Sequence, residues 1–420
     1  MRRTRKKRAV KRGNDLISQL PDSILACILS FLSTKEAART CLLSKRWTAL
    51  WTHAPSIDFN FADFIPQNAS DYKEVYYYFK KFKSIIKSVL NQRQDSLSAG
   101  FRLVWLYDTS YGFDPSFGWI PQVMDLKPSS LCLIAQTTHT SPILPGCLFN
   151  CQSLEKLELK IETEHESLFD SLSINLPRLK SLDLSFVSIH SHLMKNLLSG
   201  CAKLEELKLE RCELTFSKLI SGTLKSLVVC DCVINKKICF SIPSLLDLRV
   251  SVDYPKSRVS FKDMSSLEKA YICFDPVNAE ESDVETRNKL FPGLSNVAIL
   301  DFELRGSNCR DMMIMLQHAL VECPTFNNLH SFTVTGPLIP IVHLITRFVK
   351  RMPNLGKFII NHDENSSSQE FRRHDLVECE HLPLVEIKYK RQHNHVSKLV
   401  EALRAHVKSI GEIHMEVLKD

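Results

Sequence analysis

Apolar residues between residues 20 and 51 recur at helical spacing and outnumber the polar ones. Asp22 is expected to cap a first helix, Ser33 with Glu36 forms the capping-box pattern of a second, and Ser44 is expected to cap a third. Their apolar positions are Ile24, Leu25, Ile28, Leu29 and Leu32, then Ala37, Ala38 and Cys41, then Trp47, Leu50 and Trp51. Three short helices have too little interior to bury all of these side chains. The segment therefore needs a partner surface or contact with the following domain.

The pattern from Asp71 to Gln94 predicts one long amphipathic helix. Its expected buried face comprises Val75, Phe79, Phe82, Ile86, Val89 and Leu90. Lysines occupy other positions of the same stretch, as expected for a helix with one solvated side. Such a helix would join the first segment rigidly to the domain that follows.

A Leu-x-x-Leu-x-Leu pattern then recurs roughly every 20 to 35 residues. Its starts are Leu154, Leu179, Leu204, Leu224, Leu245, Leu267 and Leu294, with weaker copies at Leu329, Leu355 and Leu384. Two copies extend to a cysteine at the ninth position, Cys212 and Cys232, which are expected to be small core residues. Apolar positions two apart on a strand point the same way, and only stacked neighbours can bury that face. The pattern predicts a leucine-rich-repeat solenoid with a horseshoe form.

The third, fifth and seventh positions of each unit should point away from the solenoid core. They include Glu158, Asp183, Lys208 and Arg249, the candidate residues for binding a target. The charges of this surface are mixed, whereas phosphate-backbone binding requires clustered cations. A protein partner fits it better than nucleic acid, although a purely solvated role is the alternative for each single position.

Residues from about 321 onward change character. Apolar alternation near Leu382 and again from Ile413 to Val417 predicts two strands, with a helix through Val396, Leu399 and Leu403 between them. This strand–helix–strand block is expected to cap the solenoid, because the last repeat of an array needs a polar outer face.

Composition and charge place the chain in a class without settling its role. The 420 residues are 44% apolar and 24% charged, which is typical of a globular protein with a large core. No apolar run is long enough to span a bilayer, and no signal-peptide pattern is present, so we expect an intracellular protein whose fourteen cysteines stay reduced. Residues 1–12 hold eight Lys or Arg and no acid, so the net charge of +7 leaves −1 on the remainder. The leader would be a nuclear import signal, a polyanion-binding tail or an arm without a specific role.

The first segment resembles a plant-type F-box. The residues that carry the resemblance are Leu20-Pro21-Asp22, Ile28 to Leu32, Cys41 to Trp47, Leu50-Trp51 and Ile57-Asp58-Phe59-Asn60. The resemblance implies docking on a Skp1-like adaptor and, through it, on a cullin. Carried over by position, the adaptor-binding residues would be Leu20, Pro21, Ile24, Leu25, Ile28, Leu29, Leu43 and Trp47. Of these, Ile24, Leu25, Ile28, Leu29 and Trp47 are expected to face the partner. Leu50 and Trp51 are expected to face this chain and to pack on the domain that follows.

The C-terminal block resembles the FBD module that follows F-box and leucine-rich repeats in many plant proteins. The basic, histidine-rich stretch from Lys388 to His395 lacks the usual glycine of that module. The expected α/β organisation is a basic disordered leader (1–14), a three-helix F-box (15–60), a helical connector with the start of the solenoid (61–125), leucine-rich repeats (126–320) and terminal repeats with an α+β, FBD-like cap (321–420).

Motifs for catalysis or cofactors are absent from the sequence. The glycines are too far apart for a dinucleotide or phosphate-binding loop, and there is no C-x-x-C pair, H-E-x-x-H helix or G-x-S-x-G turn. Cys147 with Cys151, and Cys379 with His381, lack a second ligand pair for a metal. We therefore expect no catalytic residue, no cofactor and no metal.

The resulting hypothesis is a non-catalytic substrate-recognition subunit of a Skp1–cullin–F-box ubiquitin ligase, located in the nucleus, the cytoplasm or both. The F-box would bind the adaptor and the repeats a protein target, with no membrane association. The alternative is a nuclear scaffold that binds polyanions through residues 1–12 and partners through the repeats, with no ligase role.

Overall fold

A computed structural model describes residues 16–17, 19–66, 69, 71–93, 100–106, 117–137, 144–163, 173–254, 259–276, 290–305, 309–321, 323–362, 382–389 and 393–417. The expected basic leader, residues 1–14, and the Cys379–His381 cluster lie outside these ranges. The chain divides into two compact units, Met1–Leu154 and Glu155–Asp420, and each is described by itself.

The first unit begins with the expected helices. They are α1 (Asp22–Leu29), α2 (Thr34–Arg39) and α3 (Lys45–Leu50), with 3-10 turns η1 (Thr40–Leu42) and η2 (Trp51–His53). The capping box is confirmed, because Ser33 Oγ accepts from the Glu36 amide at 3.3 Å while Glu36 Oε2 accepts from the Ser33 amide at 3.2 Å. The expected cap at Asp22 is wrong: Pro21 is the N-cap, and Asp22 instead accepts hydrogen bonds from Arg46 of α3. Ser44 does precede α3 but makes no side-chain cap.

Three parallel strands and two helices follow in the same unit. They are β1 (Ser56–Asn60), η3 (Phe61–Phe64), α4 (Tyr72–Asn91), β2 (Gly100–Trp105), α5 (Ile120–Asp125), β3 (Ser130–Thr137) and η4 (Gly146–Phe149). The amphipathic helix is confirmed as α4. All six apolar positions of its predicted face are buried, and Phe79 and Phe82 pack against Trp105 with ring centroids 5.0 and 5.2 Å apart.

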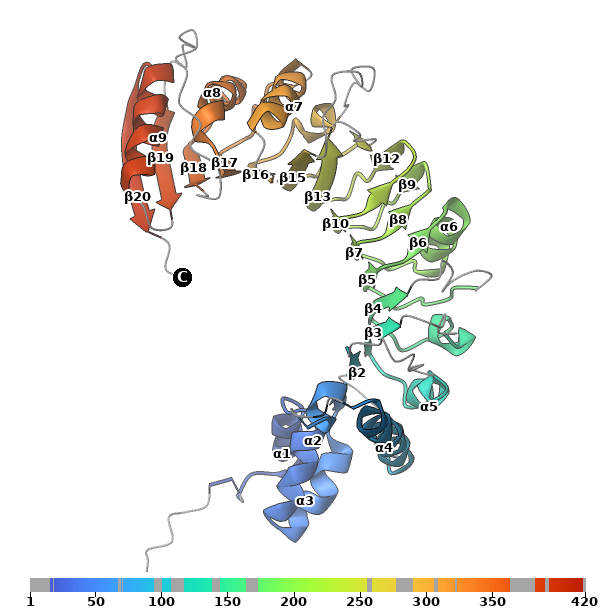
Figure 1. Cartoon of the computed structure of the whole chain (residues 1–420). Coiled ribbons are helices and arrows are strands. Elements are labelled where there is room, and N and C mark those ends of the chain that lie inside the picture. The colour runs from blue at the N-terminus through green and yellow to red at the C-terminus, as the bar shows by residue number, and fades with distance from the viewer. Residues whose placement is uncertain are drawn as a thin grey trace, which may run out of the picture. The chain divides into compact units, whose positions relative to one another are not determined.

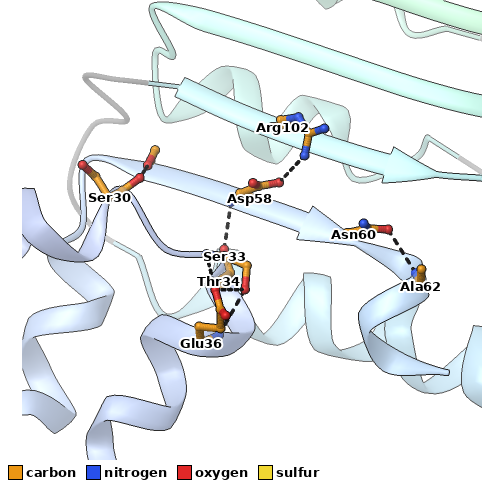
Figure 2. Close-up of polar contacts among 9 residues, drawn as sticks. Ser30, Ser33, Thr34, Glu36, Asp58, Asn60, Ala62 and Arg102 are labelled. Atoms are coloured by element: carbon orange, nitrogen blue, oxygen red, sulfur yellow. Dashed lines mark hydrogen bonds and ion pairs between the residues drawn. The ribbon is translucent and has the colours of Figure 1, made fainter. Parts of the chain in front are cut away.

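Polar contacts tie the helices of residues 22–53 to strand β1. Figure 2 shows Thr34 Oγ1 accepting from the backbone amide of Asp58 at 2.9 Å, and Arg102 of β2 donating to the Asp58 carboxylate at 3.0 Å. Arg93, which follows α4 and is buried, donates to the carbonyl of Ala54 at 2.5 Å. The three-helix segment is thus held by hydrogen bonds at its junction with the strands.

The second unit contains a long ladder of parallel strands (Figure 1). They are β4 (Lys156–Thr163), β5 (Ser181–Ser185), β7 (Glu206–Glu210), β10 (Ser226–Cys230), β13 (Asp247–Tyr254), β15 (Lys269–Pro276), β16 (Ile299–Leu304), β17 (Ser331–Gly336), β18 (Lys357–His362), β19 (Leu382–Tyr389) and β20 (Ile410–Val417). In register, Leu182, Leu207 and Leu227 stack as one buried row. The leucine-rich-repeat architecture predicted from the sequence is confirmed.

Two predicted repeat starts are out of register. Leu267 aligns with Val297, three residues beyond Leu294, because β16 begins at Ile299 opposite Lys269. Likewise, Val385 pairs with Phe358, so Leu382 rather than Leu384 takes the first position of its unit. In both repeats a nearby leucine, Leu294 or Leu384, also fits the pattern, so the predicted start was wrong.

The segments between the ladder strands form the opposite layer of the second unit (Figure 1). They comprise helices α6 (Ser191–Gly200), α7 (Cys309–Val321), α8 (Val342–Val349) and α9 (His393–His406), the turns η6 (Phe291–Leu294) and η7 (Ile339–Ile341), and the short parallel strands β6 (Ser188–Ile189), β8 (Glu213–Leu214), β11 (Val233–Ile234), β9 (Lys218–Ile220), β12 (Ile238–Ser241) and β14 (Val259–Lys262). The repeat from Leu179 to Leu204 is long enough to hold α6. The shorter repeats at Leu204 and Leu224 hold two-residue and three- or four-residue strands instead.

The C-terminal block has the predicted order of strand, helix and strand. Its strands β19 and β20 continue the parallel ladder, pairing with β18 and with each other. The inner row nevertheless ends here, since Met415 and Val417 of β20 are 61% and 56% exposed. The block is therefore a continuation of the solenoid that ends in a largely exposed strand.

Candidate docking surface and exposed strand face

The helices α1 to α3 carry an exposed apolar surface. Ile24 and Ile28 on α1 are 47% and 42% exposed, and Leu43, between η1 and α3, is 69% exposed. Pro21 is also exposed and Leu20 is half-buried against the core of this segment. These five predicted residues are available to a partner at least in part.

The predicted outward orientation of Leu25, Leu29 and Trp47 is wrong. They are 0%, 1% and 7% exposed, and form a core with Leu50 and Ala54. One position separates the buried pair of α1, Leu25 and Leu29, from the exposed pair, Ile24 and Ile28, and a step of one residue turns a helical side chain by about 100°. The buried three are structural supports of the surface.

Leu50 and Trp51 face this chain, as predicted, but the surface on which they pack differs from the prediction. Leu50 is buried and Trp51 half-buried, and both pack in the core of the three-helix segment itself, where packing on the following domain was expected. The backbone carbonyl of Trp51 also accepts from the buried Arg93 at 3.4 Å.

Three further exposed apolar residues of this segment were missing from the predicted adaptor-binding set. Leu42 is 90% exposed, Phe31 84% and Leu32 36%. The signal was present in the consecutive pair Leu42-Leu43, because a single short turn cannot bury two adjacent leucines. Beside Leu42 lies a groove of about 380 Å³ between α2 and α4. It is lined by Thr34, Lys35, Ala38, Arg39, Cys41, Leu42, Phe59, Phe64, Ile85 and Val89.

The exposed face of the ladder brings three of the four predicted target-binding residues into one ionic network. Lys160 lies 2.9 Å from Glu158 and 3.4 Å from Asp183, and Lys208 lies 3.5 Å from Asp183 and 2.8 Å from Glu210. The hydrogen bond between Lys208 and Glu210 raises the pKa of the lysine and lowers the pKa of the carboxyl. Within this network each lysine is balanced by two carboxylates.

The fourth residue, Arg249, lies outside that network. It is exposed on β13, and its guanidinium carbon is 5.6 Å from the ring centroid of Tyr271 on β15. The Tyr271 hydroxyl donates to Glu303 of β16, whose other carboxylate oxygen is 2.8 Å from Nε of Arg305. Arg305 also reaches back to Asp231, 3.2 Å away, in the loop after β10. Sequence spacing gave no sign of this series of contacts, because the residues that form it come from four different repeats.

Electrostatics within this cluster follow from burial and hydrogen bonding. Burial and the bond to Glu303 raise the pKa of Tyr271 well above its ordinary value. Burial alone would raise the pKa of Glu303 as well, but the hydrogen bonds from Tyr271 and Arg305 outweigh it and lower that pKa. Glu303 is therefore held as a carboxylate and Tyr271 as a neutral donor.

The cysteines at the ninth repeat position are buried, as predicted. Cys212 is 1% and Cys232 7% exposed, with thiols directed at backbone carbonyls such as those of Leu184 and Leu209. Within the described ranges, no group of three or more His, Cys, Asp or Glu side chains is arranged to hold a metal ion. None of the helices in the same ranges combines the length and apolar character needed to cross a membrane.

Comparison with known proteins gives matches to both modules. The F-box domain model matches residues 17–57, and a model of the repeats of the FBD-associated F-box protein At5g56370 matches residues 118–272. Similar Arabidopsis thaliana proteins include the putative F-box protein At1g58310, 29% identical across 83% of this chain and 74% of that protein. Another is the putative F-box/FBD/LRR-repeat protein At3g59240, 29% identical across 85% of this chain and 71% of that protein. The F-box/FBD/LRR-repeat protein At1g78750 is 26% identical across 82% and 77%, respectively. The chain therefore contains a segment that matches the F-box domain, at the exposed apolar helices, and a segment that matches the repeats of an FBD-associated F-box protein, and it resembles plant F-box/leucine-rich-repeat proteins over most of its length.

Proposed function

We propose that this chain is the substrate-recognition subunit of a Skp1–cullin–F-box ubiquitin ligase. The observation that carries the proposal is the exposed apolar surface of α1, η1 and the adjoining Leu43, which coincides with the matched F-box. Apolar side chains as exposed as Leu42 and Leu43 gain free energy when a partner covers them, at roughly 25 cal/mol per Å². A Skp1-like adaptor is the partner that an F-box implies.

The ladder supports the second half of this role. Its exposed face presents mixed charges and hydrogen-bonding groups on regularly spaced strands, a surface suited to a protein target. The chain would act by holding that target near a ubiquitin-carrying enzyme, so its contribution to rate is proximity, with no bond made or broken by its own side chains.

Adaptor docking can be tested with Leu43→Asp, which places a charge on the apolar surface. Full-length protein co-expressed with a plant Skp1-like adaptor should co-purify with it, and Leu43→Asp should lose the adaptor. The matched control is Ile220→Asp, because Ile220 is 54% exposed but lies on β9 in the second unit. Retention of the adaptor by Leu43→Asp would reject the docking assignment, as would its loss in Ile220→Asp.

Target recognition can be tested with the same variant. Leu43→Asp should still bind targets that it no longer delivers to the ligase, so these should accumulate on the immobilised variant relative to the unmodified chain. Equal recovery of every bound protein by the two would argue against a delivery role.

A further inference from the structure

We propose that Arg249 is the anchor at which the strand face binds a carboxylate side chain from an extended acidic segment of the target protein. The inference deepens the proposed function, since it names the chemistry that the repeats recognise. It rests on the placement of Arg249, on its charge environment and on the groups in register with it.

The guanidinium of Arg249 is held in place before any ligand arrives. Its guanidinium carbon lies over the ring of Tyr271, 5.6 Å from the centroid, and the Tyr271 hydroxyl is fixed by Glu303, which is fixed in turn by Arg305. A guanidinium held over an aromatic ring loses less conformational freedom on binding than a mobile side chain does. Arg249 is thus preorganised as a donor to a planar acceptor.

The positive charge of Arg249 is also available. Lys160 and Lys208 are each within 4 Å of two carboxylates, and Arg305 is paired with Asp231 and Glu303. Among the described residues, by contrast, no carboxylate forms an ion pair with Arg249, whose guanidinium lies over the face of an aromatic ring. A carboxylate from outside the chain would complete the pair.

The neighbouring acids select the kind of anion. Asp247 is two residues before Arg249 on the same strand face, and Asp301 is in register with Tyr271. Two nearby negative charges disfavour a dianionic phosphate more than a singly charged carboxylate. The surface is therefore suited to Asp or Glu rather than to a phosphorylated side chain or a nucleic acid.

A neighbouring residue indicates what flanks the carboxylate. Val228, half-buried on β10 and in register with Arg249, offers an apolar contact beside the charge. An extended segment with an acidic residue next to an apolar one would satisfy both groups.

The test uses the purified full-length chain, immobilised without adaptor, and four libraries of short randomised peptides. The central residue is fixed as Glu, Gln, Lys or phosphoserine. A charge-assisted pair should give retention of the Glu library about tenfold above that of the Gln library. Arg249→Gln should remove this preference, and Arg249→Lys, which keeps the charge but not the planar fork, should retain only part of it.

The matched control is Arg211→Gln. Arg211 is likewise exposed, and its guanidinium carbon lies over an aromatic ring, 5.6 Å from the centroid of Phe186. The Arg211→Gln variant should leave the preference for the Glu library unchanged. Equal retention of the Glu and Gln libraries, stronger retention of the phosphoserine library, or an unchanged preference in Arg249→Gln would overturn the proposal. Because no adaptor is present, failure here leaves the docking assignment standing, and failure of adaptor docking leaves this result unaffected.

Discussion

Alanine substitutions at two adjacent residues of α1, Ile28 and Leu29, should have different effects: one should weaken adaptor binding and the other should lower folding stability. Leu29 is 1% exposed in the core of the three-helix segment, so Leu29→Ala should cost about 2–5 kcal/mol in unfolding free energy. Ile28 is 42% exposed. Full burial of an isoleucine contributes about 1.5–3 kcal/mol, so covering its exposed part by the adaptor is worth about 1 kcal/mol, or about fivefold in Kd. Ile28→Ala should therefore weaken adaptor binding and leave stability nearly intact, whereas Leu29→Ala should do the reverse.

The chain has its own probe for this experiment. All four tryptophans, Trp47, Trp51, Trp105 and Trp119, lie in Met1–Leu154, so tryptophan fluorescence during urea unfolding follows the first unit alone. Adaptor Kd would be measured by calorimetry at a temperature where both variants are folded. The reasoning is refuted if Ile28→Ala lowers the urea midpoint as much as Leu29→Ala does, or if the folded Leu29→Ala protein binds the adaptor more weakly than Ile28→Ala.

Three further predictions concern the second unit and the thiols. Gly200→Ala should lower the thermal midpoint of unfolding measured by circular dichroism, because a Cβ at this position would overlap the backbone carbonyl of Ile174, at a cost of about 1–3 kcal/mol. The control Gly222→Ala should leave the midpoint unchanged, because the space around its Cβ is open. Stability should fall as pH drops below the ordinary Glu pKa of 4.5, because the lowered pKa of Glu210 contributes stability only while the carboxyl is ionised; in Glu210→Gln the acid loss should be smaller, and an identical pH profile would contradict this. Iodoacetamide at mildly alkaline pH should label exposed Cys27 first, whereas Cys201 and Cys323, whose thiol pKa burial raises to about 12, should react only in urea, as peptide mass spectrometry would show.

The sequence predicted those parts of the fold that depend on periodicity. The α4 face, the capping box at Ser33 and the buried ninth-position cysteines all follow from residue type and spacing. Periodicity places apolar residues on a helix but does not say which side of a nearly all-apolar helix the rest of the chain covers, and so Leu25 and Leu29 were assigned to the wrong side. It also failed where a second apolar residue stood beside the true one, as at Leu294 and Leu384.

The sequence predicted which single residues lie on the outer strand face, but it did not predict the contacts between them. Glu158, Asp183, Lys208 and Arg249 do lie on the outer face of the ladder, as their repeat positions predicted, while their role in target binding stays a prediction. Whether a charged side chain forms an ion pair depends on the register between neighbouring repeats. That register places Lys208 beside Asp183 and Arg249 beside Tyr271. The pairing of Arg305 with Asp231 spans several strands and has no local signature.

The junction at Asp58 limits how such proteins can be recombined. A chimaera cut after Asn60 would bring a foreign β1 to the native β2. It would succeed only if the donor supplied a carboxylate where Asp58 accepts from Arg102 and a backbone carbonyl where Ala54 accepts from Arg93. The natural unit of exchange is consequently the whole of Met1–Leu154 rather than the helices alone. Swapping at that larger boundary would let one repeat array be paired with another F-box without leaving the guanidinium of Arg93 without an acceptor.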